Sequence, residues 1–153
     1  MDLRKILAVT GKPGLYKLQK ENKNSLIVKS LETGRNQAIS MQRNNFTVLE
    51  TVEVYTTDED DTTSLPDVIR EMFKLDEAGT STPDIKTISE DDLRAYFQQV
   101  LENHDEERVY ISHIKKIVKW YDLLKKNNMV DLEIVEPEEE ETEKEANSEE
   151  KAD

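Results

Sequence analysis

The residues of this chain best suited to chemistry are basic side chains in two separate segments. Short strand-like runs between Gly11 and Thr57 carry one set of lysines and arginines, and the stretch from Ser112 to Asn127 carries five lysines. Lysine and arginine neutralise phosphates, so their clustering predicts contact with an RNA or DNA backbone. The candidate nucleic-acid-binding residues are Lys12, Lys17, Lys29, Arg35, Arg43, Lys115, Lys116 and Lys119.

Aromatic residues near these cations supply a second element of the hypothesis. Tyr16 and Phe46 offer flat surfaces on which unpaired bases stack. A plainer interpretation stays open: lysines on strands protect exposed edges, and lysines on a helix keep its outer face soluble. Trp120 and Tyr121 are interpreted as core residues, because aromatic side chains dominate burial in small domains.

No other pattern in the sequence predicts a catalytic residue, a metal or a cofactor. The chain has no cysteine, and its two histidines, His104 and His113, are nine positions apart and fall short of a usual zinc ligand set. The acidic run 58–61 lacks the glycine and terminal glutamate of a calcium loop, so it is interpreted as a solvated connector. We therefore expect that this protein is not an enzyme. A cleft lined by convergent carboxylates or a histidine would argue for one.

Charge is distributed unevenly along the chain, whose net charge is −13. Residues 1–57 carry +4, residues 58–88 carry −6, residues 89–129 carry −1, and residues 130–153 carry −10. The acidity is therefore concentrated in a connector and a tail, and the first segment is mildly basic.

The basic residues of the first segment must be positioned by strands. Gly11-Lys12-Pro13-Gly14 predicts a turn, residues 15–20 and 25–31 predict strands, and Gly34 predicts a tight hairpin before a weaker strand over 35–41. Residues 44–50 predict a turn with a single helical turn, and 52–56 alternates as a last strand. Residues 2–9 favour a short helix, with an edge strand as the alternative.

We therefore expect an SH3-like β-barrel over residues 1–57, because closure removes exposed strand edges. Its predicted core consists of Leu15, Leu18, Ile27, Ile39, Val52 and Val54. Because a barrel of this size is marginal alone, we expect the second half of the chain to pack on it.

The second half predicts three helices. Ser64 caps a helix to Leu75 with Pro66 in its first turn, and Ser89 caps an amphipathic helix to about Asn103. Ser112 is the predicted cap of the longest helix, which ends at Asn127-Asn128 because asparagine tolerates a left-handed backbone. Residues 130–135 predict a short strand or a docked extended arm.

The expected organisation is a barrel (1–57), an acidic connector (58–63), a helical domain (64–135) and a disordered acidic tail (136–153), which has too few apolar residues to bury. The tail is interpreted mainly as solubilising, with competition against a polyanionic ligand as the alternative. Nothing in the sequence reaches the ~20 apolar residues of a membrane-spanning helix, so we expect a cytoplasmic protein without a membrane partner.

Several blocks of the sequence resemble a family of bacterial proteins of unknown function. They are Ile6 to Lys17, which includes Gly-Lys-Pro-Gly-Leu-Tyr-Lys, then Leu31-Glu32-Thr33-Gly34, Leu93 to Phe97, and Ile114 to Tyr121, which includes Lys-Trp-Tyr. The resemblance covers residues 1–129 and implies a small β-barrel domain joined to a helical domain. It carries no catalytic residues.

The sequence thus predicts an α+β protein with an N-terminal SH3-like barrel, a three-helix unit and an acidic tail. Its predicted function is that of a non-enzymatic binding module for RNA or DNA, without a cofactor. The alternative is an adaptor that binds a protein partner through the barrel or the helical unit.

Overall fold

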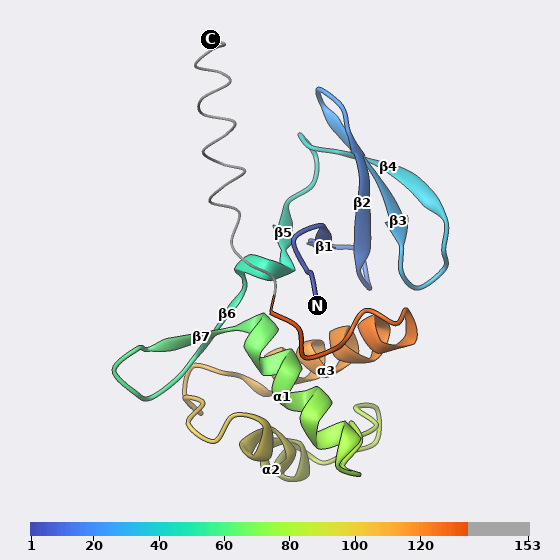
Figure 1. Ribbon diagram of the computed structural model, residues 1–153. Coiled ribbons are helices and arrows are strands. Elements are labelled where there is room, and N and C mark those ends of the chain that lie inside the picture. Colours follow the sequence, from blue (N-terminus) through green and yellow to red (C-terminus); the bar gives the residue numbers. More distant parts are fainter. Residues whose placement is uncertain (135–153) are drawn as a thin grey trace.

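The computed structural model describes residues 1–134, and the predicted acidic tail lies outside this range. An open antiparallel sheet and a helical layer lie against each other, with a two-stranded hairpin beside the helices (Figure 1). The elements in chain order are β1 Ile6–Val9, β2 Tyr16–Glu21, β3 Ser25–Ser30, β4 Asn36–Ser40, β5 Phe46–Val48, the 3-10 turn η1 Leu49–Thr51, β6 Glu53–Tyr55, β7 Thr62–Ser64, α1 Leu65–Glu77, α2 Glu90–Val100 and α3 Ile111–Lys126. The α+β class expected from the sequence is confirmed.

The five-stranded sheet has the order β4-β3-β2-β1-β5 and is not closed, so the SH3-like barrel is not confirmed. The predicted last strand, now β6, leaves the sheet and pairs with β7 through Glu53↔Ser64, Val54↔Thr63 and Tyr55↔Thr62. The sequence prediction missed β5, which pairs with β1 at the far edge through Leu7↔Val48.

Residues 6–9 form an inner strand, so the favoured helix over residues 2–9 is wrong. β1 lies between β2 and β5, and Ile6, Leu7 and Val9 are all buried. Because successive side chains of a strand point to opposite faces, an apolar run of this kind suits a strand that is covered on both sides.

The two faces of the sheet belong to different apolar clusters. One face forms its own small core from Leu7, Val9, Tyr16, Leu26, Val28 and Ile39. On the other face, Ile6 joins a larger cluster that includes Leu3, Leu15, Leu31 and Leu49 and the buried side chains of all three helices. The second half of the chain therefore packs on the sheet, as predicted.

The predicted core is confirmed in part. Leu15, Ile39 and Val54 are buried, whereas Leu18, Ile27 and Val52 are half-buried. Ile27 lies on the same sheet face as the exposed Lys20, its partner in the β2–β3 register, which explains its partial exposure.

Two of the three predicted helix caps are confirmed. The Ser64 hydroxyl accepts a hydrogen bond from the Asp67 N–H at 3.2 Å, and the Ser89 hydroxyl accepts one from Asp92 at 3.1 Å. α3 instead begins at Ile111, with Tyr110 as its cap, so Ser112 lies inside the helix. α3 ends as predicted, because Asn128 adopts a left-handed backbone with φ of 58°.

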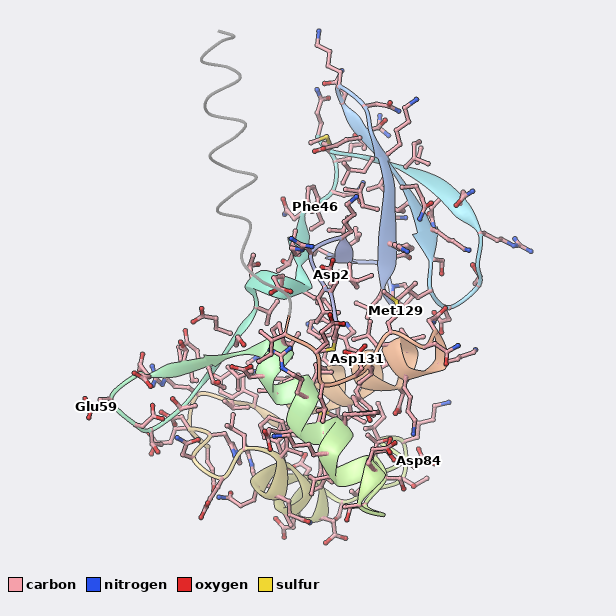
Figure 2. The ribbon with its side chains drawn as sticks, in the orientation of Figure 1. Asp2, Phe46, Glu59, Asp84, Met129 and Asp131 are labelled. Carbon is pink, nitrogen blue, oxygen red and sulfur yellow. The ribbon has the colours of Figure 1, made fainter. Side chains whose placement is uncertain are left out.

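The last described residues lie against the start of the chain as an extended arm, one of the two alternatives predicted. The Met1 ammonium donates to an Asp131 carboxylate oxygen at 2.6 Å and to the Glu133 carbonyl at 3.0 Å. Asp2 and Asp131 lie between the sheet and α1 in Figure 2. Among residues 1–134, no helix is long and apolar enough to cross a membrane.

Candidate nucleic-acid interface

The turn between β1 and β2 brings Lys12 to the surface beside α3. Gly11 and Gly14 flank Lys12-Pro13 with φ values of 84° and 81°, a conformation that glycine adopts without strain. A Cβ atom at Gly14 would lie 3.0 Å from a Glu32 carboxylate oxygen and 3.8 Å from Leu123 of α3. The glycine therefore permits a close approach of the turn to Glu32, whereas Leu123 of α3 lies at ordinary van der Waals distance from this position.

α3 presents its lysines beside this turn because its opposite face is held in the core. Ile114, Ile117, Val118, Tyr121 and Leu124 are buried. Lys115 and Lys116 are four and three positions before Lys119, a spacing that places all three on neighbouring parts of one helix surface. The Lys116 ammonium lies 5.9 Å from the centre of the Trp120 ring, within the range of a cation–π contact.

Turn and helix together form a groove of about 660 Å³, here called the lysine groove. Lys12 lines it from the turn, and Lys115, Lys116, Lys119 and Trp120 line it from α3. No aspartate or glutamate is among the lining residues. Within residues 1–134 none of the four lysines has an ion-pair partner, so their charges face solvent.

The other four candidates lie outside the lysine groove. Lys17 and Lys29 are exposed and directly opposite each other in the β2–β3 register. Arg35 precedes β4 and Arg43 follows it, so these two lie at opposite ends of one strand. The structure thus brings four of the eight predicted residues together and spreads the other four over the sheet.

The structure places the aromatic residues differently from the sequence prediction, in which Tyr16 and Phe46 were stacking surfaces and Trp120 and Tyr121 were core residues. Tyr16 is buried in the sheet core, where its hydroxyl donates to the Pro13 carbonyl at 3.2 Å, and Phe46 packs against the same cluster. Tyr16 is therefore not available for stacking, whereas Phe46 is half-buried and lies outside the lysine groove. Tyr121 is fully buried, as predicted, and Trp120 is half-buried: it packs against the larger core and also lines the lysine groove.

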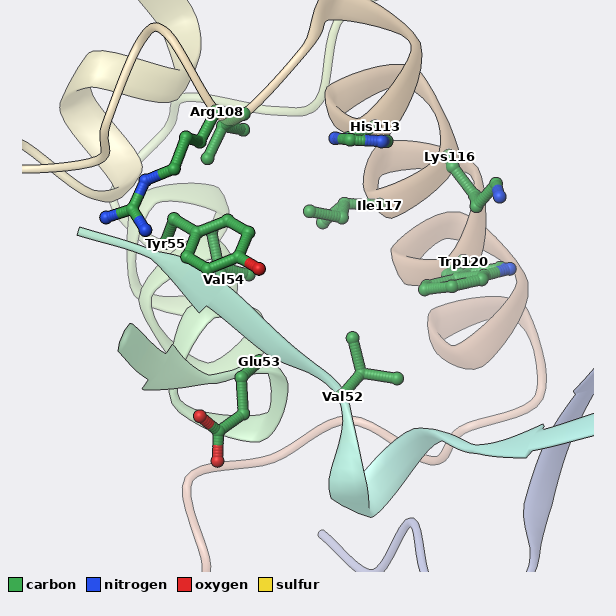
Figure 3. A pocket seen from close by; sticks show the side chains of 10 residues that line it. Val52, Glu53, Val54, Tyr55, Arg108, His113, Lys116, Ile117 and Trp120 are labelled. Carbon is green, nitrogen blue, oxygen red and sulfur yellow. The ribbon is translucent and has the colours of Figure 1, made fainter. Parts of the chain in front are cut away.

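A second hollow of about 230 Å³, here called the aromatic cavity, lies between β6 and α3 (Figure 3). It shares Val52, Lys116 and Trp120 with the lysine groove, so the two spaces are neighbours. Its remaining lining residues are Glu53, Val54, Tyr55, Arg108, Val109, His113 and Ile117. No sequence pattern predicts this cavity, because its walls come from segments more than 50 residues apart that meet only through tertiary packing.

Arg108 fixes the outer wall of the aromatic cavity. Its guanidinium carbon lies 4.2 Å from the centre of the Tyr55 ring, and the same side chain donates to Asp61 at 2.7 Å and to Asp105 at 2.9 Å. The hydrogen bond and charge of Arg108 lower the pKa of Asp105. The contacts with Tyr55 and Asp61 therefore hold the β6–β7 hairpin against the α2–α3 connection, and the contact with Asp105 orients the Arg108 side chain within that connection.

The acidic run 58–61 closes this hairpin, whose outer tip is marked by Glu59 in Figure 2. One Asp58 carboxylate oxygen accepts from Thr56, Asp60 and Asp61, and the other accepts from Asn103 at 2.7 Å. The hydrogen bond from Thr56, followed by those from Asp61 and Asp60, lowers the pKa of Asp58. Asp58 is thus a structural residue of the turn, and no cluster in the described chain has the ligands for a metal ion.

Neither histidine has the setting of a catalytic base. His104 is buried, with Nδ1 2.8 Å from the Leu101 carbonyl and Nε2 3.3 Å from an Arg94 nitrogen. A carbonyl only accepts and arginine only donates, so both ring nitrogens of His104 are engaged in hydrogen bonds within the fold. His113 is exposed, stacks on Tyr110 with ring centres 4.8 Å apart, and accepts from the Tyr110 N–H through Nδ1.

The aromatic cavity contains one histidine and one carboxylate, on opposite walls. Glu53 accepts a hydrogen bond from the Thr62 hydroxyl and points away from α3 in Figure 3. His113 and Glu53 therefore do not converge on a common point as an acid–base pair must.

Fold and surface together define an α+β protein with a basic groove between the first turn of its sheet and its last helix. Two family models match the chain: Domain of unknown function (DUF5606) over residues 3–49, and Domain of unknown function (DUF6852) over residues 52–124. The chain belongs to a bacterial family of uncharacterised two-domain proteins, as the sequence resemblance implied.

A solved structure supports this membership. The chain is similar to a Bacteroides vulgatus protein, determined in solution by NMR as a structural genomics target, with 32% identity and a TM-score of 0.67. The match covers 86% of this chain and 91% of the other. No curated protein matches the chain.

Proposed function

We propose that this protein is a non-enzymatic module that binds the sugar–phosphate backbone of a nucleic acid in the lysine groove. The observation that carries the proposal is the convergence of Lys12 with Lys115, Lys116 and Lys119 on a groove without an acidic lining residue. Four ammonium groups around one concave surface attract a chain of phosphates more strongly than they attract an isolated anion.

The negative net charge of the chain does not oppose this site locally. Residues 130–153 carry −10 of the total of −13, so residues 1–129 carry only −3. Charges separated by more than about 10 Å are largely screened at 0.1 M salt. A groove whose own lining is only basic can therefore attract phosphates on a protein that is acidic overall.

Salt dependence tests the proposal. The full chain and a version ending at Ile134 are titrated with a labelled oligonucleotide at about 50 and 200 mM salt. For a single strand the slope of log K against log salt is roughly −0.7 per phosphate contact, so four lysines predict a slope near −3 and a loss of about 50-fold. Absence of binding by both versions at the lower salt would reject the proposal and leave a protein adaptor, tested by a nuclease-resistant pull-down.

Matched lysine variants place the site. Replacing Lys12, Lys116 and Lys119 by Gln is expected to weaken binding at least tenfold and to reduce the salt slope by about 2. Replacing Lys20, Lys23 and Lys126 by Gln changes the net charge equally on exposed residues outside the groove. Equal weakening by both triple variants would show a diffuse charge effect and contradict a site in the groove.

A further inference from the structure

We propose that the aromatic cavity receives one unpaired nucleobase from a strand whose phosphates lie along the lysine groove. This inference rests on the proposed function and narrows its ligand to single-stranded nucleic acid. The cavity and the groove share Val52, Lys116 and Trp120, so one continuous surface offers cations for phosphates beside an apolar hollow.

The size and lining of the cavity suit one flat ring system. Its volume of about 230 Å³ is below the roughly 300 Å³ where pockets for drug-sized ligands begin. Val52, Val54, Val109 and Ile117 supply apolar walls, while Tyr55 and Trp120 supply aromatic ones. In Figure 3 Ile117 and Trp120 extend from α3 into the space between the helix and β6. Bases stack on aromatic side chains without regard to sequence, because every base has a flat face.

The edge of β6 adds hydrogen-bonding groups to this cavity. The Val52 carbonyl accepts from Leu65 and the Thr56 N–H donates to Asp61, both on the side of β7, whereas the Tyr55 carbonyl accepts from Asp105 on the opposite side. Peptide groups alternate between the two edges of a strand, so the N–H and carbonyl of Glu53 point to the edge that also carries the Tyr55 carbonyl. This edge faces the cavity that Glu53 and Tyr55 line, and presents a donor and an acceptor to the rim of a base.

A double-stranded nucleic acid cannot place a base in the aromatic cavity while its bases stay paired. Its bases are stacked on each other and paired within the helix, so a base enters a pocket only after it leaves the stack. A single strand presents its bases without that cost. Lys116 at the cavity rim, which has no ion-pair partner within residues 1–134, supplies a positive charge for the phosphates that flank an inserted base, whereas Arg108 is already paired with Asp61 and Asp105.

Three labelled probes of about eight nucleotides test the inference with the full-length protein: a single strand, its duplex, and a strand of abasic sugar–phosphate units with the same charge. The single strand is expected to bind roughly 5- to 100-fold more tightly than the abasic strand. It is also expected to quench the fluorescence of Trp120, the only tryptophan of the chain. The abasic strand retains the salt-dependent binding of the lysine groove but quenches little.

Two tyrosine variants form the matched control. Tyr55→Ser removes a wall of the cavity and is expected to abolish the advantage of the single strand over the abasic strand. Tyr110→Ser removes a more exposed tyrosine that does not line the cavity, and is expected to keep the advantage. Trp120→Leu, followed by anisotropy of the labelled strand, gives a second reading if Tyr55→Ser does not fold.

The outcomes separate the two proposals. Equal affinity for the three probes, lost when Lys12, Lys116 and Lys119 are replaced, overturns base insertion and leaves backbone binding in place. Binding of none of the probes at low salt overturns both. A preference for the single strand that survives both Tyr55→Ser and Trp120→Leu also contradicts insertion at this cavity.

Discussion

Two aspartates on the packed helices α1 and α3 have pKa values shifted in opposite directions. The Asp76 carboxylate accepts from the Lys125 ammonium and from the Tyr121 hydroxyl, and these contacts, led by Lys125, lower its pKa from 3.8. The nearby Asp122 accepts from Thr82 at 2.7 Å, and its pKa is raised, first by burial and then by the charge of Asp76. The surroundings thus favour the charged form of Asp76 and disfavour the charged form of Asp122.

Asp76→Asn is expected to lower the free energy of unfolding at pH 7 by about 1 to 3 kcal/mol, because charge-assisted hydrogen bonds to Lys125 and Tyr121 are weakened. A lowered folded pKa contributes stability above the unfolded value of 3.8, and this contribution disappears as the pH falls through the lowered value. The difference between wild type and variant should therefore shrink below about pH 3. Urea titrations from pH 7 to pH 2.5 measure it.

Asp122→Asn is the matched control for this experiment. The amide oxygen of asparagine still accepts from Thr82, and the substitution removes a charge that partial burial and Asp76 disfavour, so we expect a change within about 0.5 kcal/mol at pH 7. If this variant destabilises the protein as much as Asp76→Asn, the charge of Asp76 is not the cause.

At the residue scale, the sequence could predict which basic side chains are candidates for binding phosphate. It could not predict which of these side chains lie next to each other in the folded protein. The spacing of Lys115, Lys116 and Lys119 already placed them together on one helix surface. Their proximity to Lys12 depends on the packing of the β1–β2 turn beside α3, two segments that lie about 100 residues apart in the sequence. Tyr55, His113 and Trp120 likewise meet only through packing.

At the element scale, local capping signals were the most reliable part of the sequence. Ser64 and Ser89 act on N–H groups three residues ahead, so sequence spacing contains the whole interaction. β5 was missed, and β1 was predicted only as an edge-strand alternative to a favoured helix, for the opposite reason. β1 is set by burial on both faces, and β5 has only three residues.

Ser64→Ala is expected to lower the free energy of unfolding by about 1 kcal/mol, since the Asp67 N–H loses its acceptor at the start of α1. Chemical denaturation monitored by circular dichroism measures the change. Ser81→Ala, at an exposed position of the α1–α2 linker, controls for loss of a serine hydroxyl and should change stability by less than about 0.5 kcal/mol. Equal effects of the two substitutions would remove the capping argument.

At the scale of the whole molecule, the alternation over residues 52–56 predicted a strand correctly but gave no information on its partner. Closure of a barrel requires that strand to pair with the sheet. It pairs instead with β7, whose Thr62, Thr63 and Ser64 have no apolar pattern that the sequence analysis could detect. Strand pairing between distant segments is decided by tertiary packing, which one-dimensional patterns do not contain.

The larger core contains side chains from both family-matched segments, so the protein is expected to unfold in a single transition. Leu49 comes from the first segment and Ile114 from the second, and both are fully buried in this core. Leu49→Ala and Ile114→Ala are each expected to cost about 2 to 5 kcal/mol. Each substitution should lower the denaturant midpoint of unfolding. The midpoint measured by Trp120 fluorescence and the midpoint measured by loss of the β3 amide NMR signals should fall by the same amount.

A separate transition for the β3 amides, with Trp120 fluorescence unchanged by Leu49→Ala, would contradict this expectation. Ala38→Gly on the exposed face of β4 serves as the control. It alters the sheet without opening a cavity in the shared core, so it should cost only about 0.5 to 1 kcal/mol.

The shared core also constrains how such chains diversify. The interior is shared by the two family-matched segments: the first contributes Leu15 and Leu31, and the second contributes Ile114 and Leu124. A volume change on one side needs compensation on the other. A chimera that combines the first segment of one homologue with the second segment of another should therefore fold poorly unless these core residues are exchanged as a set. Natural recombination between the two segments should accordingly be rare in this family.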